Sequence, residues 1–388
     1  MATALPTRVL IVDDSRVFRN IMEKIISSTP GFQVVGGVGK GTDALEFLRL
    51  RTVDLMTLDV DMPDMDGIQA LEEMSVQKSS FKATPDVLVV SSYTQPGTDL
   101  SIKALELGAF DIIGKPGSDK PNAHEYLTQI VRNAINAWKN KRCPVPPPPL
   151  PPTAKVAAAA SEKAEAQALA DGVAKIVTTS GFAYTLAKPS PHTKPVQAIV
   201  LGVSTGGPKS LSDMLPKLCA VTDLPVILVQ HMPPNFTKSL ASSLDVKCRH
   251  KVVEGGPGMV VEPKHVYIAP GGAHMTVRAR GGDFVLETNQ DPPENGCRPS
   301  VDVLFRSAAR AYPSDTLIGI ILTGMGNDGT PALPSLKQRN AYLIAQNEES
   351  SVVFGMPRAA AATGLLDKVV SLMRVPDAVL ERIEMVVK

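Results

Sequence analysis

The 388-residue chain has little of what marks several specialised classes of protein. It has only four cysteines, and none of them form the closely spaced pairs typical of zinc-binding or redox motifs. We therefore expect neither a zinc site nor a disulfide framework, but free thiols in a reducing compartment. The four are Cys143, Cys219, Cys248 and Cys297.

The sequence also lacks long apolar runs and an excess of charge of either sign. No stretch approaches the roughly 18 apolar residues of a membrane-spanning helix, and no secretory signal is expected at the N-terminus. Forty basic residues face 39 acidic ones, which gives a net charge of +1. This balance argues against a strong basic field for nucleic acid or membrane surfaces. We expect a cytoplasmic protein that neither binds nucleic acid nor inserts into a membrane.

The first third of the chain alternates short apolar runs with segments of helical periodicity. This alternation is typical of a doubly wound α/β domain with a five-stranded parallel sheet, the flavodoxin-like type, whose ligands bind at the carboxyl ends of the strands. The expected strands cover residues 8–12, 33–38, 55–58, 87–90 and 110–113.

Polar side chains follow four of these expected strands. They are Asp13 and Asp14, then Asp59, then Ser91, and finally Lys115. Three carboxylates at one sheet edge repel one another unless a cation lies among them, and Mg²⁺ prefers oxygen ligands of this kind. A lysine and a hydroxyl at neighbouring strand ends could hold an anionic group beside the ion. A single aspartate at a strand end often only caps a helix, but this combination favours a binding site.

This arrangement resembles the receiver domain of response regulators over about residues 6–125. The resemblance is carried by residues 9–15 (VLIVDDS), residues 59–67 (DVDMPDMDG) and the pair Lys115–Pro116.

The resemblance to receivers implies a two-component phosphorylation site. It implies that Asp59 accepts a phosphoryl group from a histidine kinase, and that Ser91 and Lys115 contact the phosphoryl oxygens. It also implies Mg²⁺ ligands, namely the carboxylates of Asp13, Asp14 and Asp59 and the backbone carbonyl of Asp61.

The composition changes between residues 140 and 192. Seven prolines fall between Pro144 and Pro152, and a segment rich in alanine, glutamate and lysine follows. Such sequence favours extended or solvated structure and cannot build a core. We interpret 140–192 as a linker between the receiver and a second domain at 193–388, although a proline-rich docking motif remains an alternative.

The second domain again alternates strands and helices, which predicts a Rossmann-like α/β domain. Long apolar strands are expected near 196–203, 224–229 and 316–322, with a further strand at 341–345. Short β runs between residues 251 and 287 predict a small β insertion.

Three of these strands are each followed by one chemically distinctive residue: Ser204, His231 and Asp328. A serine hydroxyl is a weak nucleophile, which an imidazole activates by taking its proton while a carboxylate orients the imidazole. Ser204 lies in a G-x-S-x-G turn expected to lead from a strand into a helix, but the order Ser, His, Asp differs from that of α/β-hydrolases. The glycine-rich loop from Thr323 to Gly326 could supply backbone N–H groups to an oxyanion.

Each of the three residues also has a purely structural interpretation. The Gly-rich turn could bind phosphate, His231 could be a buried histidine, and Asp328 could simply form a turn. The rival histidines His265 and His274 lie in the expected β insertion, away from the row of strand ends. The joint occurrence of all three residues at strand ends favours the catalytic interpretation.

The second half resembles the catalytic domain of the CheB family of chemotaxis protein-glutamate methylesterases and glutamine deamidases. The resemblance is carried by residues 204–207 (STGG), 230–234 (QHMPP), 298–302 (RPSVD) and 322–329 (LTGMGNDG). It implies a Ser204 nucleophile, a His231 acid and base and an Asp328 orienter. It also places Thr205 near His231 and the Met325 backbone N–H in the oxyanion hole.

The two resemblances together imply a hydrolase controlled by phosphorylation. The expected substrates are glutamate γ-methyl esters and certain glutamines on the cytoplasmic helices of chemoreceptors, and the expected phosphodonor is the chemotaxis histidine kinase. We expect a monomer whose unmodified receiver blocks the hydrolytic site until Asp59 is phosphorylated, with Mg²⁺ in the receiver and no cofactor for hydrolysis.

Two other functions are compatible with part of this pattern. The second domain could be a non-catalytic module that binds a phosphate or nucleotide, but it lacks the Gly-x-Gly-x-x-Gly spacing and a Walker lysine–serine pair. It could instead be an output domain that binds a partner or DNA, but no basic recognition helix stands out.

Overall fold

The computed structural model describes residues 5–91, 95–116, 123–142 and 176–386. The chain divides into two compact units, residues 1–139 and residues 140–388. The proline-rich segment lies within residues 143–175, outside the described residues, so the linker there stays a prediction.

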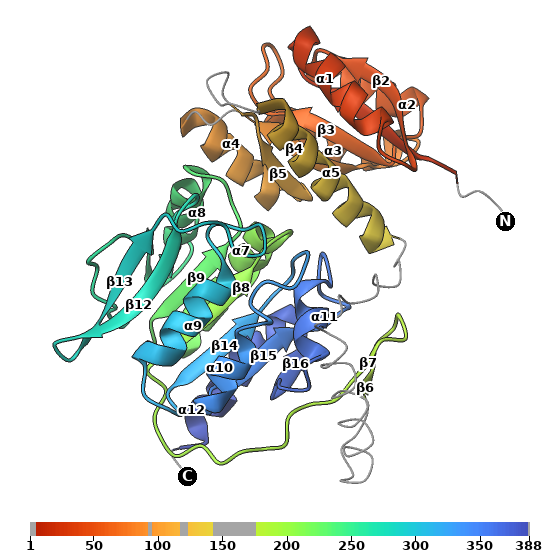
Figure 1. The fold of residues 1–388 in the computed structure, drawn as a ribbon. Coiled ribbons are helices and arrows are strands. Elements are labelled where there is room, and N and C mark those ends of the chain that lie inside the picture. Colours follow the sequence, from red (N-terminus) through yellow and green to blue (C-terminus); the bar gives the residue numbers. More distant parts are fainter. Residues whose placement is uncertain (1–4, 92–94, 117–122, 143–175, 387–388) are drawn as a thin grey trace. The chain divides into compact units, whose positions relative to one another are not determined.

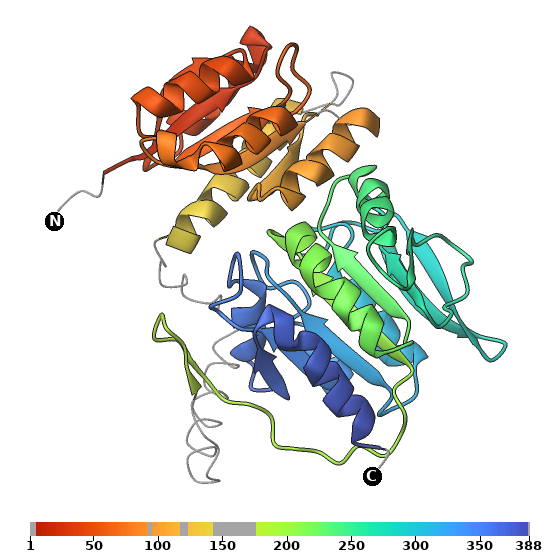
Figure 2. The same ribbon diagram turned by 180° about the vertical axis from the view of Figure 1, so that it is seen from behind.

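The first unit contains a five-stranded parallel sheet in the order β2-β1-β3-β4-β5, as the sequence predicts. Helices α1 and α5 cover one face and α2, α3 and α4 the other (Figures 1 and 2). The strands are β1 (Thr7–Val12), β2 (Phe32–Val38), β3 (Leu55–Asp59), β4 (Asp86–Ser91) and β5 (Asp111–Gly114). The helices are α1 (Arg16–Ser27), α2 (Gly41–Leu50), α3 (Gly67–Val76), a short 3₁₀ turn η1 (Lys78–Ser80), α4 (Gln95–Glu106) and α5 (Ala123–Arg142).

The central strands of this sheet are buried on both faces, which explains their continuous apolar sequence. All five residues of β3 are buried, and so are the last four residues of β1. Helix α1 begins directly after β1, where the Ser15 hydroxyl accepts a hydrogen bond from the Phe18 amide. The turns between strand and helix therefore lie at the carboxyl edge of the sheet.

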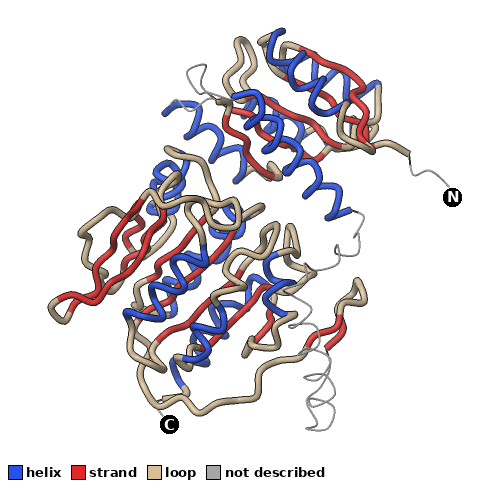
Figure 3. Tube along the Cα trace, viewed as in Figure 1, coloured by secondary structure: helices blue, strands red, loops and turns tan. Residues whose placement is uncertain are grey.

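The second unit is built on a seven-stranded parallel sheet in the order β10-β11-β9-β8-β14-β15-β16. Figure 3 shows these strands in one layer with helices on both faces. The strands are β8 (Ala198–Val203), β9 (Val226–Gln230), β10 (Lys251–Glu254), β11 (His265–Ile268), β14 (Leu317–Ile321), β15 (Tyr342–Gln346) and β16 (Lys368–Val370).

Helices cover both faces of this larger sheet. Figure 1 shows α9 and α10 in front of it, and Figure 2 shows α7 and α12 on the opposite face. The helices are α7 (Gly207–Val221), α8 (Phe236–Asp245), α9 (Val301–Ala311), α10 (Leu333–Gln338), α11 (Met356–Ala361), the 3₁₀ turn η3 (Leu372–Arg374) and α12 (Val375–Glu384).

The β runs between residues 251 and 287 divide between two sheets. Strands β12 (His274–Arg280) and β13 (Asp283–Asn289) form a separate antiparallel hairpin, the expected small insertion. Strands β10 and β11 instead extend the main sheet, because the buried residues Val266, Tyr267 and Ile268 of β11 pair with β9. His265 begins β11 and therefore lies at the edge of the sheet opposite the carboxyl ends of the strands.

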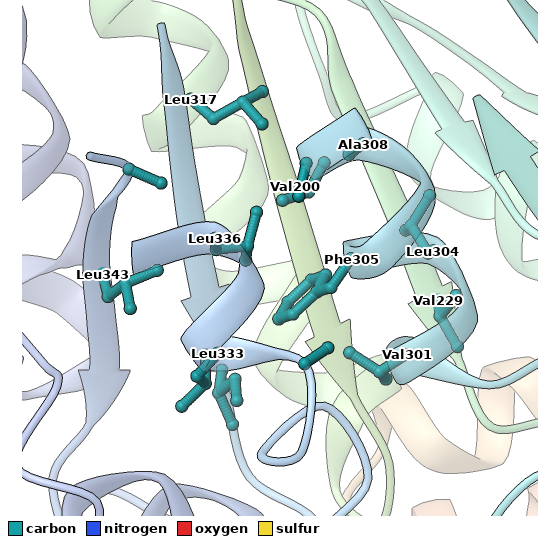
Figure 4. Packing of buried hydrophobic residues seen from close by; sticks show 14 of the residues in the cluster. Val200, Val229, Val301, Leu304, Phe305, Ala308, Leu317, Leu333, Leu336 and Leu343 are labelled. Atoms are coloured by element: carbon teal, nitrogen blue, oxygen red, sulfur yellow. The ribbon is translucent and has the colours of Figure 1, made fainter. Parts of the chain in front are cut away.

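The core under α9 fixes the position of that helix on the sheet. Figure 4 shows Val301, Leu304 and Phe305 of α9 packed near Val200 of β8 and Val229 of β9. All five side chains are fully buried. The N-terminus of α9 is thereby held beside the carboxyl ends of β8 and β9.

Residues 176–192, which the sequence analysis assigns to the linker, pack on the second unit. A small hairpin of β6 (Ile176–Val177) and β7 (Ala183–Tyr184) places the buried Tyr184 in the hydrophobic core. The His192 ring contacts the Asp315 carboxylate, with Nδ1 2.5 Å from Oδ1. Within the described residues, no helix has both the length and the apolar character needed to cross a membrane.

Candidate functional site

Ser204 occupies the sharp turn between β8 and α7. Its amide donates to the Thr323 carbonyl at 2.9 Å, and its own carbonyl accepts from the Gly207 amide at 2.7 Å. Gly206 completes the turn with a φ of 76°, and a Cβ there would lie only 2.4 Å from Val352. Glycine is required at this position on both counts. The turn places Ser204 at the carboxyl edge of the sheet and at the N-terminus of α7.

His231 follows the neighbouring strand at the equivalent position. Val203 pairs with Gln230 in the parallel register of β8 and β9, so Ser204 and His231 are the next residues on two adjacent strands. Such strands lie about 4.8 Å apart. The Gln230 carboxamide nitrogen donates to the carbonyls of Ser204 (3.0 Å) and His231 (3.1 Å), and so ties the two strand ends together.

Asp328 lies in the loop that follows β14, the strand on the other side of β8. Its Oδ2 accepts from His231 Nε2 at 2.8 Å and from the Val301 amide at 2.7 Å. Its Oδ1 accepts from the Ser300 hydroxyl at 2.8 Å and from the Asn295 carboxamide at 3.0 Å. This carboxylate is buried, and the N-terminus of α9 and several polar groups compensate its charge.

The electrostatics of the pair follow from these contacts. Burial alone would raise the pKa of Asp328, but the hydrogen bond and charge of His231 together with the backbone donor of Val301 hold it below its usual range. Burial alone would lower the pKa of His231, but its contacts with Asp328 and Cys297 raise it above the ordinary value of histidine. The pair therefore favours an imidazolium beside a carboxylate, the charge state formed when the histidine takes a proton.

Asp328 also fixes which ring nitrogen of His231 carries a proton. A carboxylate only accepts, so Nε2 carries the single proton of the neutral ring, and in that form Nδ1 can act as a base. Nδ1 lies 3.7 Å from the Sγ atom of Cys297. In the described part of the chain, no hydrogen bond joins the Ser204 hydroxyl to the ring, and catalytic hydrogen bonds often tighten only when substrate binds.

The glycine-rich loop after β14 packs directly against Ser204. A Cβ at Gly324 would lie 2.7 Å from the Ser204 Cβ, so only glycine allows this approach. The Gly324 amide donates to the Val353 carbonyl at 3.0 Å. Met325 comes next and is 38% exposed. Thr205 is buried, and its carbonyl accepts from the Thr323 hydroxyl at 3.0 Å.

A second group of functional side chains, three aspartates and a lysine, lies at the carboxyl edge of the five-stranded sheet. Lys115 Nζ lies 2.5 Å from Asp59 Oδ2 and 2.7 Å from Asp13 Oδ2. One carboxylate oxygen each of Asp13, Asp14 and Asp59 lies within 4.8 Å of the others. Burial raises the pKa of Asp59 to about 6 despite the attraction of Lys115.

This donor set fits a hard divalent cation such as Mg²⁺, because it consists of three carboxylates whose oxygens lie close together. The backbone of Asp61 adjoins it, since the Asp61 amide donates to Asp59 Oδ1 at 3.3 Å. Ser91 ends the buried strand β4, and its carbonyl accepts from the Lys115 amide at 2.7 Å. The residues named from the sequence are thus gathered at one edge.

Several residues around Asp328 have no role in the sequence analysis. Asn295 donates from its carboxamide to both Asp328 and Asp302, and the Asp302 carboxylate in turn accepts from the Ala332 amide. Burial and the nearby Asp328 raise the pKa of Asp302. Residues 298–302 carry part of the family resemblance, and that motif is the one signal that points to this loop.

Comparison with known proteins agrees with both halves of the structure. Residues 9–127 match the response regulator receiver domain, and residues 199–379 match the CheB methylesterase family. A protein-glutamate methylesterase/protein-glutamine glutaminase of Desulfotalea psychrophila is 37% identical over 97% of this chain and 99% of its own length. A protein of the same name from Pyrococcus abyssi is 37% identical over 99% of this chain and 95% of its own length.

A solved structure is also similar to the second unit. The CheB methylesterase catalytic domain of Thermotoga maritima is 39% identical, with a TM-score of 0.47, and the match covers 48% of this chain and 99% of that one. The two family matches and the order of strands in the two sheets identify the protein as a response regulator with a receiver domain and an α/β output domain. Because its curated relatives match over nearly their full length, the chain belongs to the CheB family of protein-glutamate methylesterases/protein-glutamine glutaminases.

The raised pKa of His231 gives a direct test of its bond to Asp328. In an NMR titration, we expect the His231 ring to titrate above the value of about 6.5 for a free histidine. The contact of protonated His231 with Asp328 then stabilises the fold fully below a pH of about 6.5. This stabilisation is lost as the pH rises through the pKa of His231 in the folded protein. Replacing Asp328 by asparagine should lower the pKa, because the carboxylate charge disappears.

His250 provides the control for this titration, since its ring bonds to the Thr222 carbonyl rather than to Asp328. Its titration should be the same in both proteins. An Asp328→Asn protein in which His231 titrates as in the wild type would contradict the pairing.

Proposed function

We propose that this chain is a cytoplasmic, phosphorylation-controlled hydrolase that removes γ-methyl ester groups from glutamates and amide groups from certain glutamines on chemoreceptor helices. The observation that carries the proposal is the hydrogen-bonded pair of Asp328 and His231 at the strand end adjacent to Ser204. Family membership supports the same reaction class. The non-catalytic alternatives have no comparable support.

In the proposed reaction, the Ser204 hydroxyl attacks the ester or amide carbonyl while His231 takes its proton. Asp328 orients the ring and stabilises the imidazolium, as in other serine hydrolases. The imidazolium then protonates the leaving group, which departs as methanol from an ester or ammonia from an amide. A water molecule, deprotonated by the same imidazole, releases the glutamate and regenerates Ser204.

The negative charge of the tetrahedral intermediate needs donors close to Ser204. We assign this role to the Met325 backbone N–H, because the Gly324 position packs against Ser204 and the Gly324 amide already bonds to Val353. Thr205 supports the turn next to the nucleophile. Donors of this kind typically contribute about 10²–10³ in turnover.

We assign control of the hydrolytic activity to the receiver domain. Asp59 is the proposed acceptor of a phosphoryl group from a histidine kinase, with Ser91 and Lys115 contacting its oxygens. Asp13, Asp14, Asp59 and the Asp61 carbonyl would hold Mg²⁺, which neutralises phosphoryl charge when bound. Phosphorylation adds about −1.5 to −2 charges at this edge and shifts the receiver away from a state that blocks the hydrolytic site.

Ser204→Ala removes the nucleophile, so methanol release from methylated receptor membranes should fall by about 10⁴-fold or more. The rate of methanol release is measured by gas-phase detection of labelled methanol. The matched control is Ser242→Ala, which changes an exposed serine on α8 whose hydroxyl donates to the Lys238 carbonyl. Methanol release by the Ser204→Ala protein at the rate of the control would exclude the nucleophile assignment.

Asp59→Asn removes the proposed phosphoryl acceptor. A small acyl phosphate with Mg²⁺ should accelerate methanol release by the wild-type protein but not by this variant. Asp43→Asn, an exposed acidic change in the first turn of α2, should keep the full stimulation. Equal stimulation of the Asp59 variant and the wild type would overturn control through Asp59.

A further inference from the structure

Cys297 brings a thiol next to the catalytic histidine. It lies half-buried in a tight turn, where the backbones of Glu294 and Cys297 exchange hydrogen bonds of 3.1 and 2.9 Å. Its Sγ lies 3.7 Å from His231 Nδ1, the ring nitrogen that carries no proton in the neutral ring. Donor atoms of His231, Cys297 and Asp328 all lie within 4.8 Å of one another.

We propose that His231 Nδ1 and the Cys297 thiolate form a binding site for a thiophilic divalent cation such as Zn²⁺, and that the bound cation inhibits the hydrolase. The inhibitory part rests on the proposed function, whereas the metal site does not. Sequence patterns do not predict this site, because 66 residues separate the two ligands and no second cysteine lies nearby in the chain.

The distance between the two donor atoms matches a shared metal ion. Zinc binds sulfur at about 2.3 Å and imidazole nitrogen at about 2.0–2.1 Å, so two ligands of a tetrahedral ion lie about 3.6 Å apart. The observed separation of Nδ1 and Sγ is 3.7 Å. The separation of the two donor atoms therefore equals that of two ligands on one zinc ion.

Asp328 completes the site as a support for the histidine rather than as a ligand. Both of its oxygens already accept hydrogen bonds, from His231 and Val301 on one side and from Ser300 and Asn295 on the other. A carboxylate that accepts the second N–H of a metal-bound histidine orients the ring and makes it a better ligand. The bond that serves catalysis thus also favours metal binding.

The two protein ligands leave coordination positions for water, as in an open site rather than a closed structural one. Binding displaces the thiol proton of Cys297 and the Nδ1 proton of the imidazolium to solvent, and the cation then occupies the Nδ1 lone pair. His231 then cannot take a proton from Ser204, so inhibition follows directly. A thiolate selects zinc or cobalt over Mg²⁺, whereas the carboxylates of Asp13, Asp14 and Asp59 suit Mg²⁺.

Cobalt substitution tests the metal site without any activity measurement. With the full chain in excess Mg²⁺, added Co²⁺ should produce a thiolate-to-cobalt charge-transfer band that Zn²⁺ abolishes. Cys297→Ser should remove the band. Cys248→Ser is the matched control, because Cys248 is also half-buried but its thiol bonds to that of Cys219, and its loss should leave the band unchanged.

Inhibition by zinc tests the second part of the proposal, which is that the bound cation blocks hydrolysis. Zn²⁺ should slow methanol release by the wild-type protein, and a chelator should restore the rate. Each variant is compared with its own metal-free rate. Cys297→Ser should require at least tenfold more Zn²⁺ for half inhibition, whereas Cys297→His, which supplies another zinc ligand, should stay sensitive but show no charge-transfer band.

The outcomes separate the two proposals. A cobalt band that persists in Cys297→Ser, or equal zinc sensitivity of that variant and the wild type, would overturn the metal site. A band that depends on Cys297 in a protein without methanol release would retain the metal site and contradict the hydrolase.

Discussion

The hydrogen bond between Asp328 and His231 is the interaction on which the second unit depends for its chemistry. A buried carboxylate is unfavourable unless donors surround it. Here the α9 amide of Val301, the Ser300 hydroxyl and the Asn295 carboxamide supply those donors. The carboxylate can therefore stay ionised out of water and hold the imidazole in one tautomer. The packing of α9 on β8 and β9 is what keeps these donors in place.

Both units use the same property of parallel sheets, which is that the carboxyl ends of neighbouring strands converge. In the first unit this edge gathers acidic side chains and Lys115, a combination suited to a cation and a phosphoryl group. In the second it gathers a hydroxyl, an imidazole and a carboxylate. One architecture thus accommodates phosphorylation and hydrolysis, with the difference residing in a few side chains.

The sequence predicts the strand ends well because buried parallel strands are continuous apolar runs, as in β8 and β14. It does not predict which sheet a short strand joins, so the prediction that β10 and β11 belong to the insertion is wrong. It also misses the surroundings of Asp328. Asn295 and Cys297 come from an irregular turn, whose approach to His231 depends on how α9 packs and not on any local periodicity.

The central claim is that the pair of His231 and Asp328 activates Ser204, and covalent labelling tests it most directly. A serine-directed phosphonofluoridate should modify Ser204, identified by peptide mass spectrometry, and the labelling rate should rise with pH as His231 loses its proton. His231→Ala should reduce the labelling rate by at least about 10²-fold, the usual contribution of a positioned base. Labelling of Ser204 at an unchanged rate in that variant, or of other serines instead, would contradict the claim.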